Sequence, residues 1–171
     1  MTPLPTALLP GHPATPLTVW RLERTQHAAD WAQGIGAERV GGRWSPKGRP
    51  VIYAALDPAT AILEVAVHAG FEVLDTVPYR MLEIEILTPL TVKVVLPSEV
   101  PNSQWLRRGA VTTGMQKFGA ELLDQHPFIL IPSVVSRYSW NLIIDVASAK
   151  AHIRRVRDEA FGLDGRLSLA E

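Results

Sequence analysis

Cysteine is absent from this chain of 171 residues. Its absence excludes a disulfide-stapled scaffold and any metal site built on thiolates. A chain that needs no disulfides suits a reducing compartment, so we expect a cytoplasmic protein. No stretch approaches the roughly 20 apolar residues that a membrane span requires, and we therefore expect no contact with a membrane.

Net charge is lacking too, because 17 Lys and Arg residues balance 17 Asp and Glu residues. Domains that bind nucleic acid through its phosphates usually carry a basic excess, so we expect no direct nucleic-acid binding. The five histidines show no HExxH or similar ligand spacing, and we expect no metal. A GxGxxG turn after a strand, a P-loop and a GxSxG elbow are also missing, which removes many common enzyme classes.

Proline, in contrast, is concentrated at the N-terminus, where it occupies five of the first 16 positions. This segment lacks the charged start and apolar run of a signal peptide. We interpret residues 1–16 as an extended arm. Residues 17–171 are predicted to form a single domain, since domains usually contain roughly 100–150 residues.

Short apolar runs bounded by turn formers predict strands, and longer patterned runs predict helices. Because the two types are mixed without a regular βαβ rhythm, the sequence predicts an α+β fold. The predicted strands are Leu17–Leu22, Val51–Ala55, Met81–Ile86, Thr91–Leu96, Phe128–Pro132 and Asn141–Val146, and the predicted helices are Gln26–Gln33 (ended by Gly34 and Gly36), Pro58–Ala69, Gln104–Arg108, Val111–His126 and Ser148–Phe161.

The second of these helices has clear ends and an unusual composition. Asp57 is a candidate N-cap, and Gly70 suits the C-terminal stop. Inside the helix only Thr60, Glu64 and His68 interrupt the apolar residues, and they lie four apart. They therefore form one narrow polar stripe, which we expect to face water, a cleft or a partner.

Five side chains combine useful chemistry with a special backbone setting. Arg43 follows two glycines, which let backbone approach a ligand closely, and its guanidinium suits a phosphate. Tyr53 offers an aromatic face with a polar tip, and Glu64 is the acid of the polar stripe. Ser133 directly follows an apolar strand, and Arg21 lies on the first strand. Taken singly, each also fits an ordinary structural role.

The order and spacing of these residues resemble the RES domain, which is named for its arginine, glutamate and serine. The matching motifs are GGRWSPKG from residue 41, VIYAA from residue 51, AILEV from residue 61 and IPS from residue 131. The resemblance covers roughly residues 19–146. Departures are Ser45 where relatives often carry asparagine, Ala120 where they often carry aspartate, and no proline after Asn141.

The resemblance implies a fold similar to ADP-ribosyltransferases, with mixed or antiparallel strands and flanking helices. It implies the toxin of a type II toxin–antitoxin pair, which cleaves the nicotinamide–ribose bond and depletes cellular NAD. By motif, Arg43, Tyr53 and Glu64 would be the catalytic trio, and Arg21 and Ser133 would be further NAD-binding residues. The implied partner is an Xre-like helix-turn-helix antitoxin, with NAD as the substrate and no metal required.

Such a bond breaks through an oxocarbenium-like state, as glycosidic bonds do. Glu64 would stabilise the growing charge through a ribose hydroxyl, while Arg43 would hold the pyrophosphate and Tyr53 would stack on nicotinamide. Two alternatives stay open: transfer of ADP-ribose to a specific protein target, and a catalytically inactive binding module. A ribonuclease toxin is disfavoured by the neutral charge and the absence of a histidine pair.

Overall fold

The computed structural model describes residues 1–12 and 15–164 of the chain, and a seven-stranded sheet forms its centre. The strands are β1 (Leu17–Arg24), β2 (Val51–Ala55), β3 (Tyr79–Ile86), β4 (Val92–Val94), β5 (Phe128–Pro132), β6 (Trp140–Asp145) and β7 (Ile153–Phe161). Their order in the sheet is β4-β5-β6-β2-β1-β3-β7. β4 and β5 are parallel, whereas the other neighbouring pairs are antiparallel, so the sheet is mixed.

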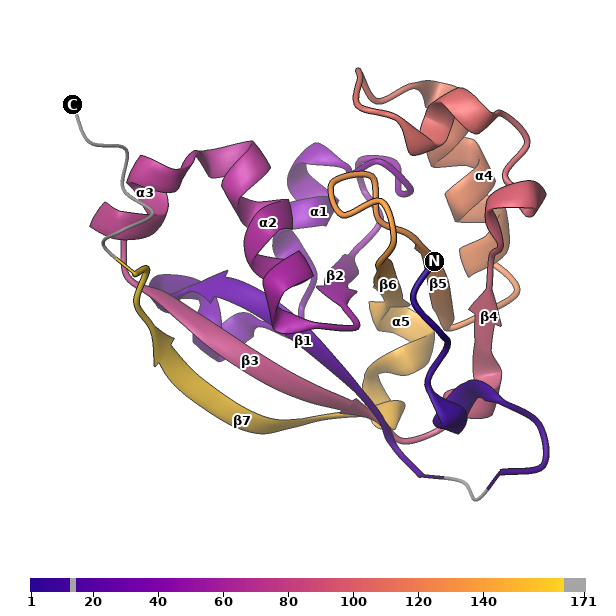
Figure 1. Cartoon of the computed structure of the whole chain (residues 1–171), viewed down its shortest axis with the longest axis horizontal. Coiled ribbons are helices and arrows are strands. Elements are labelled where there is room, and N and C mark those ends of the chain that lie inside the picture. The colour runs from indigo at the N-terminus through magenta and orange to yellow at the C-terminus, as the bar shows by residue number, and fades with distance from the viewer. Residues whose placement is uncertain (13–14, 165–171) are drawn as a thin grey trace.

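Most neighbouring strands are antiparallel and the helices do not follow a regular βαβ pattern, which confirms the α+β class. Figure 1 shows α2 and α3 beside β1 and β3, and α4 at the other side of the molecule near β4. The α-helices are α1 (Ile35–Val40), α2 (Pro58–Ala69), α3 (Phe71–Thr76), α4 (Thr113–Leu123) and α5 (Val146–Ala149), and the 3-10 helices are Thr6–Leu8, Thr25–Asp30, Pro89–Thr91, Pro97–Glu99, Ser103–Leu106 and Lys150–His152.

Side chains alternate between the two faces of the sheet along each strand, and both faces carry core clusters. On one face, Ile52 of β2 and Leu142 of β6 belong to the largest core cluster. On the opposite face, Ile143 packs with side chains of α4, and Leu22 packs with side chains of α2. The candidate site lies on this second face, on elements between the two helical coverings.

α2 begins and ends where the sequence predicts. Asp57 caps it by accepting a hydrogen bond from the Thr60 amide at 2.7 Å, and Gly70 follows the last turn with φ 87°. The expectation that the whole polar stripe faces water, a cleft or a partner is wrong for Thr60, which is 2% exposed. Its hydroxyl lies 2.8 Å from the Asp57 carboxylate and 2.8 Å from the Ser139 hydroxyl. This end of the stripe is thus a buried hydrogen-bond network.

The helix predicted over Ser148–Phe161 is wrong, because most of that stretch forms the nine-residue strand β7. β7 pairs with β3 so that Arg154 lies opposite Glu85, and Arg157 lies opposite Glu83. Both pairs form cross-strand ion pairs. Pairing with the backbone of β3 and complementary charge on adjacent strands override the local preference for helix.

Another difference lies before β2. Instead of the helix predicted over Gln26–Gln33, residues Thr25–Asp30 form a 3-10 helix. The glycines expected to end it belong to the next element, since Gly34 precedes α1 with φ 66° and Gly36 lies inside α1. A Cβ on Gly34 would lie 2.7 Å from the Val51 amide nitrogen, so packing against β2 also requires glycine there.

The remaining corrections concern length. Only a 3-10 turn forms where a helix is predicted over Gln104–Arg108. α4 is shorter than the predicted Val111–His126, and β4 is shorter than the predicted Thr91–Leu96. β4 is at the edge of the sheet, where short strands are common.

The N-terminal segment packs against the domain. Within it, Thr6–Leu8 form a 3-10 turn rather than extended chain, and Ala7 is buried. The Thr2 carbonyl accepts a hydrogen bond from the indole of Trp140 at 3.1 Å. The division into an arm of residues 1–16 and a domain of residues 17–171 stays a prediction, and residues 13–14 and 165–171 lie outside the described part. Among the described residues, no helix has the length and apolar character needed to cross a bilayer.

Candidate active site

A tight turn after α1 presents Arg43 beside β2. Gly41 has φ 76°, a conformation that favours glycine, and the Gly42 amide donates to the Ser45 carbonyl at 2.9 Å. A Cβ on Gly42 would lie 2.7 Å from Cζ of Tyr53, so the turn packs directly on the tyrosine ring. The two glycines therefore permit both the turn and its close approach to β2.

α4 holds this turn from the other side. The side-chain amide of Gln116 donates to the Gly42 carbonyl at 3.0 Å. A Cβ on Gly119 would collide with the Trp44 carbonyl oxygen and would lie 2.7 Å from its carbonyl carbon. Trp44 is buried and meets the ring of Phe118 edge to face. Gly119, which weakens the helix locally, is thus required for the contact between α4 and the turn.

Tyr53 fixes the turn through its hydroxyl. The oxygen accepts a hydrogen bond from the Trp44 amide at 3.1 Å and lies 3.0 Å from the Ser45 hydroxyl. Burial raises the pKa of the Tyr53 phenol, although hydrogen bonds from Ser45 and Trp44 and the charge of Arg43 oppose that shift. The hydroxyl is accordingly protonated at neutral pH and can donate as well as accept.

Arg43 is half-buried and meets only neutral groups. Its guanidinium donates to the carbonyls of Trp105 at 3.4 Å and Gly109 at 3.2 Å, and it lies 3.6 Å from the sulfur of Met115. Among the described residues, no carboxylate forms an ion pair with it. Burial lowers the pKa of Arg43, while the charge of Glu64 opposes the shift. An arginine remains charged even so, and this cation suits an anionic ligand.

Glu64 is anchored through one of its two carboxylate oxygens. Its Oε1 accepts from the Ser133 hydroxyl at 2.7 Å and from the side-chain amide of Asn141. Ser133 is 2% exposed, and its oxygen also accepts from the amides of Val135 and Ser136. Within the described chain, no group donates to Oε2. The carboxylate is therefore anchored through Oε1, and Oε2 keeps its capacity to accept a hydrogen bond.

The sheet brings these residues together. Ala55 on β2 lies opposite Asn141 on β6, so Tyr53, two residues before Ala55, shares a face with Asn141. Ser133 follows β5, the other neighbour of β6, and Glu64 reaches the same place from α2. Four of the predicted residues, Arg43, Tyr53, Glu64 and Ser133, thus lie on one side of the sheet.

Arg21, the fifth, does not join them. It lies on the same face of β1 as Val19, and Val19 belongs to the core cluster on the face of the sheet opposite the site. Its guanidinium forms an ion pair with Glu23 and donates to the Tyr53 carbonyl at 2.7 Å. The pairing between β1 and β2 is short, so the Tyr53 carbonyl lies beyond its end and accepts its hydrogen bond from Arg21 instead. A direct role of Arg21 in binding NAD stays a prediction.

The predicted site did not include Asn141 or Ser45, although both contact it. Asn141 is the only polar residue between Trp140 and Ile144, in the apolar part of β6. A polar residue at such a position needs a partner, which is the signal that identifies it. Ser45 is fully buried beside Tyr53, and only the structure reveals that contact.

The model of the RES domain matches residues 18–164. The chain belongs to the RES-domain family. A protein named Toxin Res from Photorhabdus laumondii is 31% identical over 159 residues, which cover 91% of this chain and 99% of that protein. Toxin Res from Pseudomonas putida is 34% identical over 138 residues, with coverages of 78% and 90%. A Prs ADP-ribosylating toxin from Sphingobium is 30% identical over 139 residues, with coverages of 77% and 84%.

A solved structure shares the fold of this RES domain. It is the crystal structure of the M. tuberculosis MbcT–MbcA toxin–antitoxin complex, with a TM-score of 0.62 and 18% sequence identity. The match covers 86% of this chain and 85% of the other. The α+β fold with a mixed sheet and flanking helices, which the resemblance implies, is thereby confirmed.

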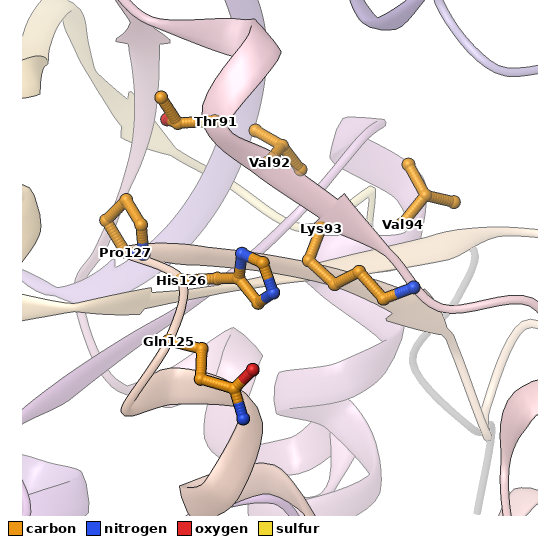
Figure 2. Close-up of a pocket in the computed structure, with 7 residues that line it drawn as sticks. All are labelled: Thr91, Val92, Lys93, Val94, Gln125, His126 and Pro127. Atoms are coloured by element: carbon orange, nitrogen blue, oxygen red, sulfur yellow. The ribbon is translucent and has the colours of Figure 1, made fainter.

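Two surface hollows of this RES domain lie away from the five predicted residues. One, of about 590 Å³, is formed by Thr91–Val94 along β4 and by Gln125–Pro127 before β5 (Figure 2). The other, about 300 Å³, is lined by Arg24–Gln26 with Val77 and Pro78. The hydrogen-bonded side chains form the candidate site instead, because a reaction requires convergent polar groups rather than volume alone. In residues 1–12 and 15–164, no three metal-ligating side chains gather as a candidate metal site.

Proposed function

We propose that this RES domain is a toxin that cleaves the nicotinamide–ribose bond of NAD in the cytoplasm and depletes cellular NAD. The observation that carries the proposal is the anchored Glu64 carboxylate, held through Oε1 alone, in the electric field of an Arg43 cation without a carboxylate partner. Relatives of 31% and 34% identity are named as toxins, and one of 30% identity is named as an ADP-ribosylating toxin.

Heterolysis of this bond needs stabilisation of a cation. The bonding electron pair leaves with the pyridine nitrogen of nicotinamide, and positive charge spreads over C1′ and the ring oxygen of the ribose. Oε2 of Glu64 accepts a hydrogen bond from a ribose hydroxyl and stabilises that charge. Water then adds to C1′ and releases a proton, which gives ADP-ribose and nicotinamide.

Arg43 binds the pyrophosphate. Its hydrogen-bond partners are two carbonyls and a sulfur, and no carboxylate of the described residues forms an ion pair with it. A pyrophosphate supplies a negative charge, and a guanidinium can bind it through two parallel hydrogen bonds. Binding the remote phosphates orients the ribose for the reaction.

The other predicted residues support this pair. The hydroxyl of Tyr53 fixes the turn that carries Arg43, and its ring stacks on nicotinamide. Ser133 positions Glu64. Arg21 acts from behind the sheet by holding the carbonyl of Tyr53. NAD is thus the substrate, and no step requires a metal.

Transfer of ADP-ribose to a protein is the second candidate, favoured by the name of the Sphingobium relative. The same cation forms, and an acceptor side chain replaces water. An antitoxin is the proposed partner, because the structural neighbour is a toxin–antitoxin complex. We propose an Xre-like helix-turn-helix antitoxin, whose addition should abolish turnover.

The decisive experiment compares nicotinamide release from NAD by the partner-free protein and by Glu64→Gln. Glutamine keeps an Oε1 acceptor for Ser133 and Asn141 but loses the charge, so we expect an unchanged melting temperature and a loss of about 10²–10³-fold in turnover. Wild-type turnover in the variant would refute the role of Glu64. Intact-mass spectrometry of lysate with labelled NAD separates transfer from hydrolysis, and no reaction in either assay supports the inactive binding module.

A further inference from the structure

The side-chain amide of Asn141 has a partner for its nitrogen but none for its oxygen among the described residues, which is unusual inside a sheet. It lies on β6, between β2 and β5, opposite Ala55 on one side and Ile131 on the other. Its side-chain nitrogen donates to Oε1 of Glu64. Its Oδ1 is buried and has no hydrogen-bond partner in the described chain.

An unpaired buried acceptor costs free energy, so native proteins rarely keep one without a reason. Turning the amide over would bring Oδ1 against the Glu64 carboxylate, where two acceptors repel. The orientation of Asn141 is therefore set by Glu64, and the unpaired Oδ1 is its consequence. An apolar side chain of the same size would avoid this cost.

Asn141 and Ser133 converge on the same oxygen. Both donate to Oε1, and Ser133 is itself locked by the amides of Val135 and Ser136. One donor restrains the distance of the carboxylate, whereas two donors, one on β6 and one directly after β5, also restrain its rotation. Oε2 is the oxygen that this arrangement leaves without a donor.

We propose that Asn141 is a positioning residue that orients Glu64 so that Oε2 faces the ribose of the substrate. This inference rests on the function proposed above. A purely structural role, in which Asn141 merely ties α2 to the sheet, makes a different prediction. It requires a marked loss of stability when the side-chain amide is removed, and a loss of activity only in proportion to unfolding.

The test is Asn141→Leu, which keeps the volume and removes both the donor and the unpaired acceptor. We expect kcat for nicotinamide release to fall about 10–100-fold with little change in KM, because orientation matters most in the transition state. The melting temperature should stay within about 4 °C of the wild type, since loss of the bond to Glu64 is offset by removal of the unpaired acceptor. Ile143→Leu, on the same strand and face, is the control and should keep its kcat.

A second arm uses the shared oxygen. Ser133→Ala leaves Asn141 as the donor, and Asn141→Leu leaves Ser133. Because either change alone already frees the carboxylate to rotate, the double variant should lose less kcat than the product of the two single losses. Losses that simply multiply would contradict a joint action on Oε1.

The outcomes separate the two proposals. An active wild type with an equally active Asn141→Leu overturns the positioning role and leaves the proposed function standing. A melting temperature lowered by well over 4 °C, with activity lost in proportion, also overturns it. If the wild type itself releases no nicotinamide, crystal structures of both proteins decide: a Glu64 carboxylate that keeps its orientation in Asn141→Leu refutes the inference, and a displaced one supports it.

Discussion

Arg43 and Arg49 lie close in the sequence but meet opposite environments. Arg49 forms ion pairs with Asp124 at 2.7 Å and Asp145 at 2.9 Å, so its charge is compensated within the protein. Arg43 meets only carbonyls and a sulfur. Because a half-buried cation is stabilised by a counter-charge, the difference indicates that Arg49 ties elements together and that Arg43 is available for an anion.

Gly42 is the residue on which the position of Arg43 depends most directly. We expect Gly42→Ala to lower kcat/KM for NAD about tenfold or more, because the new methyl group displaces the Tyr53 ring and the turn around Arg43. The same overpacking should cost about 1–3 kcal/mol of stability. Nicotinamide release and thermal unfolding measure the two effects.

Gly36→Ala is the matched control for that variant. Gly36 lies in α1, where an added Cβ would meet nothing within 4 Å, and alanine favours a helix. Activity should be unchanged and stability equal or higher. If Gly42→Ala behaves like Gly36→Ala, the packing of the turn on Tyr53 does not matter for the site.

At the scale of elements, local signals predicted α2 and could not predict β7. The cap at Asp57 and the stop at Gly70 are encoded next to the helix itself. The strand state of β7 depends on its pairing with β3, which is remote in the sequence. Gly119 in α4 is a similar case. Glycine lowers the local preference for helix, but the contact that requires it is with Trp44, which is remote in the sequence.

The candidate site also contains residues that local motifs predict and one that only the tertiary structure reveals. Arg43, Tyr53, Glu64 and Ser133 are found from the order and spacing of their motifs. Asn141 becomes meaningful only when β6 is placed between β2 and β5 beneath Glu64. Sequence reasoning therefore supplies the proposed chemical groups, and the sheet register adds Asn141, the residue that we propose orients Glu64.

The start of α2 should give the fold a measurable pH dependence. Burial opposes the charge of Asp57, but hydrogen bonds from Ser139 and Thr60 outweigh it and lower the pKa of the carboxyl. Because the pKa is lower in the folded state, the carboxylate stabilises the fold at any pH above the pKa of the unfolded chain, about 3.9. This contribution is lost as the pH falls through the pKa of the folded state.

We therefore expect Asp57→Ala to destabilise the protein by about 0.5–2 kcal/mol at pH 7, as loss of an N-cap does. The difference from the wild type should shrink as the pH falls below about 4, because the carboxyl group is then protonated first in the unfolded chain and, at its lower pKa, in the folded protein. Chemical denaturation across this range measures it, with Glu38→Ala, an exposed carboxylate, as the control. A difference that does not change with pH would show that the charge of Asp57 contributes nothing.

At the scale of the whole molecule, the N-terminal segment lies outside the residues matched by the RES family, which begin at residue 18, yet it packs on the core. Leu4 and Leu8 contact the large cluster on the face opposite the site. The segment also binds Trp140, the residue before Asn141, through the Thr2 carbonyl. It thus supports from behind the strand that positions Glu64.

Leu8 and Leu9 allow this support to be measured with neighbouring residues of one type. Leu8 packs against the core, whereas Leu9 is 36% exposed. Leu8→Ser should cost about 1–2 kcal/mol, less than a fully buried leucine, and should lower the melting temperature by about 2–8 °C. Leu9→Ser should change it little. Equal melting temperatures for the two variants would mean that the segment adds no stability, and the domain would then consist of the family-matched residues alone.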